Sequence, residues 1–161
     1  MSIIISRVRE LLEKKGFNPI NTKNVEDQIL LPGVNFKNGG GYNLIFNGRD
    51  FSNDNLAAFI SLTAFPIKVP LNKREKISKF LNAINTGGLA SWLAINMEEG
   101  EIICRSGLFS KSNDAISEDI IDPLIFSTSG RLDNLQPYIM ELIYSEKTVE
   151  DILKEMSQTA K

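Results

Sequence analysis

The order of strand and helix patterns constrains the fold of this chain more than any other feature of its sequence. Apolar residues recur at helical spacing over about 2–15, and a run of three strand-like segments follows. A second helical pattern begins near residue 72, two further strands follow it, and the chain is helical from about residue 117. The predicted order is α-β-β-β-α-β-β-α-α-α. Because strands and helices are segregated rather than alternating, we expect an α+β fold with a five-stranded antiparallel sheet.

The predicted strands are short apolar segments separated by turn-forming residues. Within the first run, a polar connection spans Asn47–Asn55, and Asn47-Gly48 resembles a type I′ turn. Glu98-Glu99-Gly100 is typical of a hairpin turn between the last two strands. The strands are expected at 28–31, 42–46, 56–65, 89–97 and 101–109.

Capping residues mark the expected helix ends. Ser2 can cap the first helix, and Gly16 follows its last turn as a C-terminal glycine does. Asn72 and Glu75 have the spacing of a capping box at the start of the second helix. Pro123 removes a hydrogen bond from any helix that contains it, so we expect a restart or a kink just before this residue.

Large apolar side chains occupy both faces of the predicted strands, although an antiparallel sheet with one open face normally alternates apolar and polar residues. In strand 56–65 we assign the face of Ile60 to the core, which leaves Phe59 and Phe65 on the second face. Trp92 likewise opposes the apolar face of the next strand. Either the C-terminal helices cover this second face, or it binds a subunit or a partner protein. The predicted anchors of such a surface are Phe59, Phe65 and Trp92.

The chain contains no histidine and a single cysteine, Cys104. Without histidine there is no Ser-His-Asp or Cys-His catalytic arrangement and no His-ligated metal site. One cysteine excludes an intramolecular disulfide, a C-x-x-C pair and a cysteine cluster. Only carboxylate, lysine or Ser/Thr chemistry remains, and we predict that the protein is not an enzyme and uses no cofactor and no metal.

The residues that could carry the remaining chemistry have structural explanations. Gly39-Gly40-Gly41 precedes a strand rather than a helix and lacks the spacing of a phosphate loop, so it is interpreted as a strand connection. The acidic residues within 98–101 belong to the hairpin tip. Those within 118–122 lie in the first turn of a helix, where they complement the helix dipole. Cys104 is expected to be a buried strand residue with an inert thiol.

Positive charge is concentrated in the N-terminal half. Residues 1–80 carry 12 Lys and Arg against 7 Asp and Glu, a net charge of +5, and residues 81–161 carry 6 against 13, a net charge of −7. The densest basic stretch, 68–79, lacks interleaved aromatic residues, and the overall pI is about 5.3. Such a stretch is more typical of a solvated helical face than of a nucleic-acid site. We therefore do not expect nucleic acid as a partner.

The N-terminal apolar run, Ile3-Ile4-Ile5, is shorter than the core of about 7–15 apolar residues that a signal peptide needs. No segment approaches the stretch of about 18 apolar residues that spans a membrane. Together with the single cysteine, these features predict a cytoplasmic protein with no membrane partner. No internal repeat or linker divides the sequence, so residues 1–161 are expected to form a single domain.

The segment from the second helix onward carries a motif found in a known family. Phe80-Leu81-Asn82-Ala83-Ile84-Asn85 is followed by a strand, an acidic turn and a strand that ends Ile103-Cys104-Arg105-Ser106. This arrangement resembles the YbjN family, whose members carry a hydrophobic-Asn-x-hydrophobic-Asn helix end before such a hairpin. The helix start at 116–118 and the closing helix at 137–142 fit the same layout, and the element order resembles the type III secretion chaperone-like fold.

Asn82 and Asn85 of this motif also have a structural explanation. Asn85 can adopt the left-handed conformation at the helix end, and Asn82, one turn earlier, can bond the exposed backbone there.

The resemblance implies a small cytosolic bacterial protein, commonly dimeric, without catalytic residues. Our first hypothesis is a YbjN-like protein-interaction module, chaperone-like or regulatory, that binds an unidentified polypeptide as a homodimer. The second hypothesis, from a different class, is a regulatory domain that binds a small molecule between the sheet and the helices. A monomer that has no protein partner but co-purifies with a metabolite would favour the second hypothesis.

Overall fold

The computed structural model describes residues 2–23, 25–39, 41–51, 56–87, 91–111 and 117–159. The α-helices are α1 (Ile3–Lys14), α2 (Arg74–Asn85), α3 (Glu118–Ile125), α4 (Arg131–Tyr144) and α5 (Val149–Thr159). A 3₁₀ turn, η1 (Leu71–Lys73), precedes α2, and a π-helical segment, η2 (Phe126–Gly130), joins α3 to α4. The strands are β1 (Ile20–Asn21), β2 (Gln28–Asn35), β3 (Gly41–Phe51), β4 (Leu56–Ala64), β5 (Trp92–Ile95) and β6 (Ile102–Lys111).

The strands form one antiparallel sheet in the order β1-β2-β3-β4-β6-β5. The α+β class and the antiparallel pairing are confirmed, but the sheet has six strands rather than five. The additional strand, β1, is two residues long, which is too short to produce a period-two pattern in the sequence. The predicted polar connection begins too early, because β3 continues to Phe51 and pairs there with Leu56.

Gly48 lies inside β3 because helix α1 crosses the strand at this residue. A Cβ atom on Gly48 would lie 2.5 Å from side-chain carbons of both Ile4 and Ile5. Glycine therefore permits the close approach of α1, and the predicted turn at Asn47-Gly48 is wrong. Ser2 caps α1 as expected, since its Oγ accepts a hydrogen bond from the Ile5 N–H at 3.4 Å.

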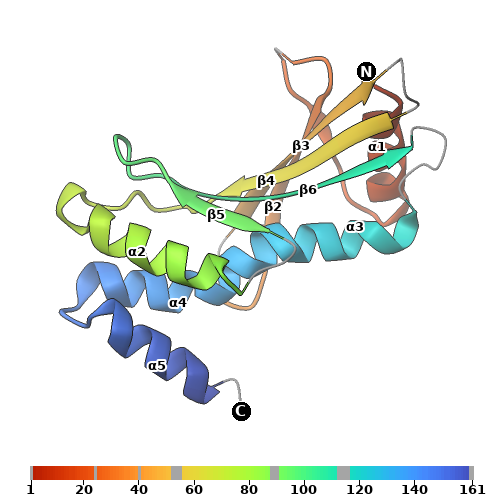
Figure 1. Cartoon of the computed structure of the whole chain (residues 1–161). Coiled ribbons are helices and arrows are strands. Elements are labelled where there is room, and N and C mark those ends of the chain that lie inside the picture. Colours follow the sequence, from red (N-terminus) through yellow and green to blue (C-terminus); the bar gives the residue numbers. More distant parts are fainter. Residues whose placement is uncertain are drawn as a thin grey trace.

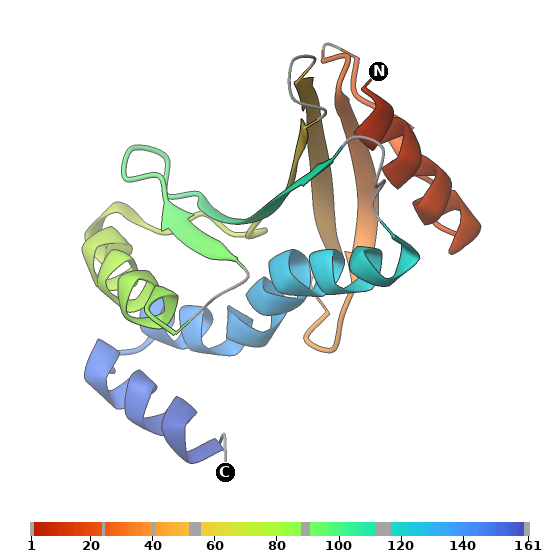
Figure 2. The same ribbon diagram turned by 45° about the vertical axis from the view of Figure 1, so that its right-hand side comes forward.

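The described helices all lie on one side of the sheet (Figure 1). Figure 2 shows the sheet as strongly bent, with α1, α2 and the α3–α4 stretch along its outer side. Between these layers lies a core of buried aliphatic and aromatic side chains, in which Phe46 and Phe59 stack with ring centroids 5.7 Å apart. Burial of this face supplies the main hydrophobic contribution to folding. Within the described residues, the opposite face of the sheet carries no helix.

The helical stretch that runs under the sheet continues through Pro123. The helix does not restart before this proline as expected, and the irregularity lies after it, in the π-helical segment 126–130. A widened helical turn leaves carbonyl groups without their usual N–H partners. Hydroxyl groups compensate here, for example Thr128 Oγ1, which donates to the Leu124 carbonyl oxygen at 2.9 Å.

Helix α2 begins through a 3₁₀ turn and not through a side-chain cap. Asn72 lies inside η1, so the predicted capping box is wrong. Instead Arg74, the first residue of α2, donates hydrogen bonds to the carbonyl oxygens of Val69 at 3.0 Å and Met97 at 2.8 Å. The bond to Met97 holds the start of α2 against the β5–β6 hairpin, whose turn at 98–100 forms as predicted.

Candidate functional site

The face of the sheet that carries no helix is the candidate functional site. Antiparallel pairing aligns its outward-facing residues in rows across the strands. One row is Leu30, Ile45, Leu62, Arg105 and Trp92. The next two rows are Gln28, Asn47, Ile60 and Gly107, and then Arg49, Ala58 and Phe109. We call these twelve positions the open face.

Three large apolar side chains of the open face are exposed. The exposed fractions are 43% for Ile60, 52% for Trp92 and 74% for Phe109. Isolated exposed apolar residues are common on protein surfaces, but a contiguous set on one sheet face usually marks a binding surface. The open face therefore has the character of an interaction site.

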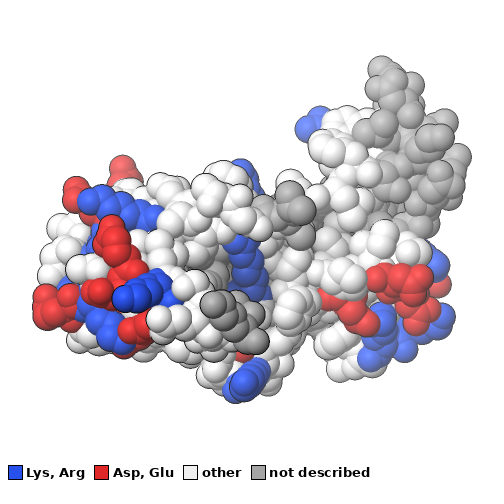
Figure 3. All heavy atoms as spheres, turned by 60° about the horizontal axis from the view of Figure 1, so that its bottom comes forward, with Lys and Arg blue, Asp and Glu red and all other residues white. Residues whose placement is uncertain are grey.

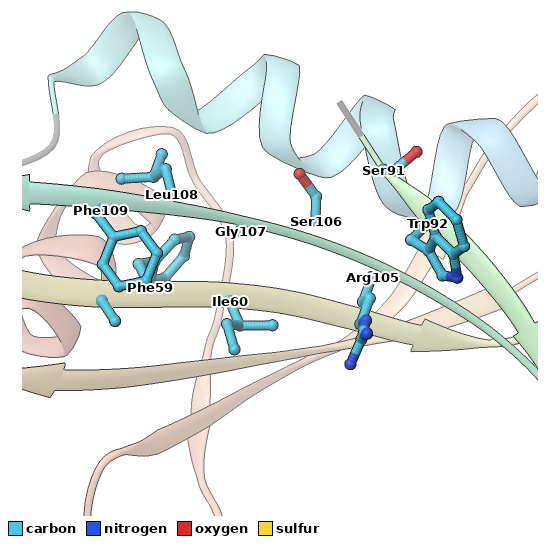
Figure 4. A pocket seen from close by; sticks show the side chains of 10 residues that line it. Phe59, Ile60, Ser91, Trp92, Arg105, Ser106, Gly107, Leu108 and Phe109 are labelled. Atoms are coloured by element: carbon cyan, nitrogen blue, oxygen red, sulfur yellow. The ribbon is translucent and has the colours of Figure 1, made fainter. Parts of the chain in front are cut away.

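A groove of about 370 Å³ crosses the open face at Gly107. Trp92 and Arg105 line one end of the groove, Phe109 lines the other, and Ile60 lines it from the neighbouring strand. Figure 4 shows Ile60 and Arg105 projecting from β4 and β6 toward the same side, away from Ser106 and Leu108. Gly107 contributes no side chain between its two outward-facing neighbours on β6, and this absence creates the hollow.

Arginine supplies the only formal charge at the open-face positions. None of the twelve positions is Asp or Glu. In the part of the chain that the structure describes, Arg105 makes no ion pair or hydrogen bond through its side chain, and the Arg49 guanidinium lies 5.4 Å from the centroid of the Phe51 ring. The open face thus combines apolar anchors with two guanidinium groups that pair with no carboxylate among the described residues.

The sequence-based assignment of the two faces is correct for β5 but reversed for β4. Trp92 is exposed as expected, but Phe59 and Phe65 are buried, with exposed fractions of 0% and 4%, so these two are wrong as surface anchors. The helices pack on the aromatic face of β4 and not on the face of Ile60. Period-two alternation fixes which residues share a face, but it does not decide which face the helices will cover.

Ile60 and Phe109 are the exposed open-face residues that the sequence interpretation missed. A usable signal was present for Phe109, because the alternation of Ile103 and Arg105 continues along β6 to this residue. Once Arg105 is assigned to the outer face, Phe109 must share that face, and its register partner Ala58 then places Ile60 there too.

Asn82 and Asn85 have different environments. Asn82 is exposed, and Asn85 is buried in the last turn of α2. The predicted left-handed conformation of Asn85 is wrong, because the residue is helical. Its Nδ2 donates to the Leu93 carbonyl oxygen at 2.8 Å, and the Leu93 N–H donates to its Oδ1 at 3.0 Å. Asn85 therefore bonds the backbone of edge strand β5, which supports a structural role.

Cys104 is a buried core residue on the inner face of β6. Burial raises the pKa of its thiol to about 11, and a hydrogen bond with Ser91 and the charge of Arg131 oppose this only partly. A thiol with a raised pKa and no solvent access is a poor nucleophile.

The acidic residues at 118–122 pair with the end of α1. Glu118 lies 2.7 Å from the Lys14 Nζ, and Asp122 lies 2.9 Å from the Lys15 Nζ. The hydrogen bond from Lys14 holds the pKa of Glu118 below its ordinary value, and the bond with Asp122 raises the pKa of Lys15. These are ordinary surface ion pairs between two helices. Within the described ranges, no group of three His, Cys, Asp or Glu side chains is placed to hold a metal ion.

Some basic side chains around α2 form hydrogen bonds within the protein. Lys73 and Lys76 each donate to the Ser145 carbonyl oxygen at 3.4 Å, at the C-terminal end of α4. Positive charge is favourable at a helix C-terminus. Figure 3 shows basic and acidic side chains intermixed at one end of the molecule, which is unlike the continuous basic surface of a typical nucleic-acid site.

Parts of four predicted segments lie outside the described residues. These are Gly40 of the glycine run, residues 52–55 of the predicted polar connection, the first residues of the strand predicted at 89–97, and Ile116 of the predicted helix start. Among the described helices, none has the length and hydropathy that a membrane-spanning segment requires.

The fold has counterparts among solved structures, although the sequence matches no family model and no curated protein. The crystal structure of YbjN from E. coli, a candidate transcription regulator, superposes with a TM-score of 0.55 at 12% sequence identity. The similarity covers 83% of this chain and 92% of the other. The chain has a YbjN-like fold. An uncharacterized protein from Methanothermobacter thermautotrophicus is similar over 84% of this chain and 94% of its own length, with 16% identity and a TM-score of 0.46.

The YbjN-like fold agrees with the resemblance drawn from the 80–106 segment. At 12% identity the similarity concerns the arrangement of helices and strands and does not transfer a function.

Proposed function

We propose that this chain is a non-catalytic protein-interaction module, chaperone-like or regulatory, that acts in the cytoplasm as a homodimer and binds another polypeptide. The observation that carries the proposal is the open face, where Ile60, Trp92 and Phe109 are exposed together on one side of the sheet. Aromatic side chains in such positions contribute much of the energy of protein interfaces.

Strand addition is hindered at the outermost strands of the sheet, although β6 continues to Lys111, beyond the end of its pairing with β5 at Arg105. At one edge, both backbone groups of Leu93 on β5 are bonded by the Asn85 side chain. At the other edge, β1 is two residues long. An exposed strand edge is the usual site for strand addition, and short or blocked edges disfavour it. Strand addition is therefore disfavoured at β5 and β1, and the exposed apolar side chains make the open face the more favourable site for a partner.

A small-molecule regulatory domain is the second candidate function. The groove of about 370 Å³ is within the size range of ligand pockets, and it combines Trp92 and Phe109 with one guanidinium, that of Arg105. Shallow grooves of this kind enclose a small ligand poorly, whereas a polypeptide can continue beyond the groove onto the rest of the open face.

Transcriptional regulation, the role suggested for the E. coli protein with this fold, is compatible with a protein-binding module. Regulation would then proceed through contact with another protein, because the basic residues of α2 are engaged with Ser145 and mixed with acidic side chains. Binding to DNA would require a continuous basic surface.

Light scattering and affinity capture test the proposed function. The wild-type chain is expected to elute as a dimer and to bind a polypeptide that, once purified, reconstitutes the complex. Trp92→Ala should weaken that reconstituted complex at least tenfold, since truncation of an interface aromatic typically costs more than about 1.4 kcal/mol. Lys154→Gln, at an exposed position on α5, is the matched control and should leave binding unchanged. A monomer without a protein partner but with a co-purified metabolite would overturn the proposal.

A further inference from the structure

The open face has a spacing that matches an extended polypeptide. Arg105, Gly107 and Phe109 are successive outward-facing residues of β6, so neighbouring positions are separated by about 6.8 Å. An extended segment repeats its own side chains at the same distance on each face. Two or three side chains of such a segment can therefore meet the end of the groove at Arg105, the hollow at Gly107 and the end at Phe109 in turn.

The hollow at Gly107 suits an apolar side chain. The position that a Cβ atom on Gly107 would take lies 3.2 Å from the Phe59 carbonyl oxygen and 3.4 Å from Cγ1 of Ile60, so Ile60 borders the hollow directly. Ile60 and Phe109 provide apolar walls, and Trp92 lines the other end of the groove. A Leu-sized group placed there would bury apolar area that the isolated chain leaves exposed.

The end of the groove that Arg105 lines suits a carboxylate group of the partner. The guanidinium has no ion-pair partner among the described residues, and Trp92 is its register neighbour on β5. Arg49 places a second positive charge on the row of Phe109. Guanidinium groups form strong paired hydrogen bonds with carboxylates, especially where an aromatic ring limits access of water.

A second copy of this chain is a poor occupant for the same surface. In a two-fold symmetric contact, the open face would meet an identical open face. Its twelve positions contain Arg49 and Arg105 but no Asp or Glu, so the guanidinium groups would gain no acidic partner. Charge complementarity favours a partner that brings its own carboxylates.

We propose that the open face binds an extended polypeptide segment in which an acidic and an apolar residue lie two positions apart, so that both face the sheet, with the apolar side chain in the Gly107 hollow and the carboxylate on Arg105. This inference rests on the proposed function and names the partner chemistry. Specificity for acidic segments comes from Arg105, and general affinity for polypeptide comes from Trp92, Ile60 and Phe109.

Synthetic peptides test this inference directly. The probes are three fluorescein-labelled twelve-residue peptides in which every second residue is in turn Leu and Glu, Leu and Gln, or Leu and Lys, with Ser at the positions between them, so that both residue types face the sheet. Binding is measured by anisotropy and by the emission of Trp92, which is the only tryptophan of the chain and lies in the groove. The Glu peptide is expected to bind most tightly, with affinity that falls as salt rises, and to shift the Trp92 emission toward shorter wavelength.

Arg105→Gln separates the acidic specificity from binding in general. The variant should bind the Glu peptide about tenfold more weakly than the wild type and the Gln peptide equally well. Lys154→Gln removes the same charge from α5 and should change neither affinity. Arg105 is exposed, so the variant is expected to fold, and an unchanged urea midpoint verifies this.

The failures of the two proposals are distinguishable. Equal affinity for the Glu and Gln peptides, with no effect of Arg105→Gln, overturns the acidic partner and leaves polypeptide binding intact. Absence of binding by all three peptides overturns both proposals. A dimer that Trp92→Asp converts to a folded monomer identifies the open face as a contact between two copies and overturns the acidic partner.

Discussion

The side-chain amide of Asn85 pairs with the backbone of Leu93 as a neighbouring strand would. Asn85 Nδ2 donates to the Leu93 carbonyl oxygen at 2.8 Å, and the Leu93 N–H donates to Asn85 Oδ1 at 3.0 Å. The pair joins the last turn of α2 to edge strand β5 and removes two groups that another strand could otherwise use. This arrangement explains why an asparagine ends the helix just before the β5–β6 hairpin.

Asn85→Ala is expected to destabilise the protein by about 1–3 kcal/mol, because two backbone groups at a buried position lose their partners. Equilibrium unfolding in urea, followed by circular dichroism, measures the change. Asn82→Ala is the matched control, since Asn82 is an exposed residue of the same helix, and it should change the stability by less than about 0.5 kcal/mol. Equal effects of the two substitutions would contradict the role assigned to Asn85.

Phe59 and Phe109 test the assignment of the two sheet faces. Phe59 is fully buried and stacks on Phe46, so Phe59→Ala should cost about 3–5 kcal/mol of stability. Phe109 is 74% exposed on the open face, and Phe109→Ala should cost less than about 1 kcal/mol. Urea midpoints of the two variants provide the comparison. A large loss of stability in Phe109→Ala would place this side chain in a core and remove it from the proposed binding surface.

The element order and the apolar character of both sheet faces could be predicted from local sequence, because each depends on spacing along one segment. The choice of covered face could not, since it depends on where α1 and the α3–α4 stretch pack. The same limit explains the wrong turn at Gly48, a residue whose meaning depends on Ile4 and Ile5 more than forty positions away. Tertiary contacts override local turn preferences in such cases.

The candidate site shows the same division between local and long-range information. Trp92 could be identified as an exposed residue because it lies opposite the apolar face of a short alternating strand. Phe109 could have been assigned from the alternation along β6, but Ile60 required the register between β4 and β6, which pairs Ile60 with Gly107 and Ala58 with Phe109. Register is set by distant strands and is not encoded in either segment alone.

Gly48→Ala is expected to destabilise the protein by about 1–3 kcal/mol, because the new methyl group would displace α1 from the sheet. Thermal unfolding provides the measurement. Gly87→Ala, where nothing lies within 4 Å of the added carbon, is the control and should be neutral or slightly stabilising. A neutral Gly48→Ala would show that α1 does not cross β3 at this residue.

Cys104 is expected to be unreactive toward thiol reagents in the folded protein. The thiol is fully buried, and its pKa is raised to about 11, so both access and ionisation are suppressed. At pH 8, labelling by a disulfide reagent should be slow in buffer and fast in concentrated urea. Rapid labelling of the native protein would contradict the buried position of Cys104 in the core.

The same pKa shift makes stability depend on pH in a defined window. The unfolded thiol loses its proton near the ordinary value of 9.0, whereas the folded thiol keeps it until about pH 11. Between these values the unfolded state binds fewer protons, so stability falls as pH rises, by at most about 1.4 kcal/mol per pH unit. Cys104→Ala lacks this group, and its stability should decline less steeply from pH 9 to 10 than that of the wild type. Because lysines titrate equally in both proteins, parallel pH profiles of the wild type and Cys104→Ala would exclude the raised pKa of the thiol.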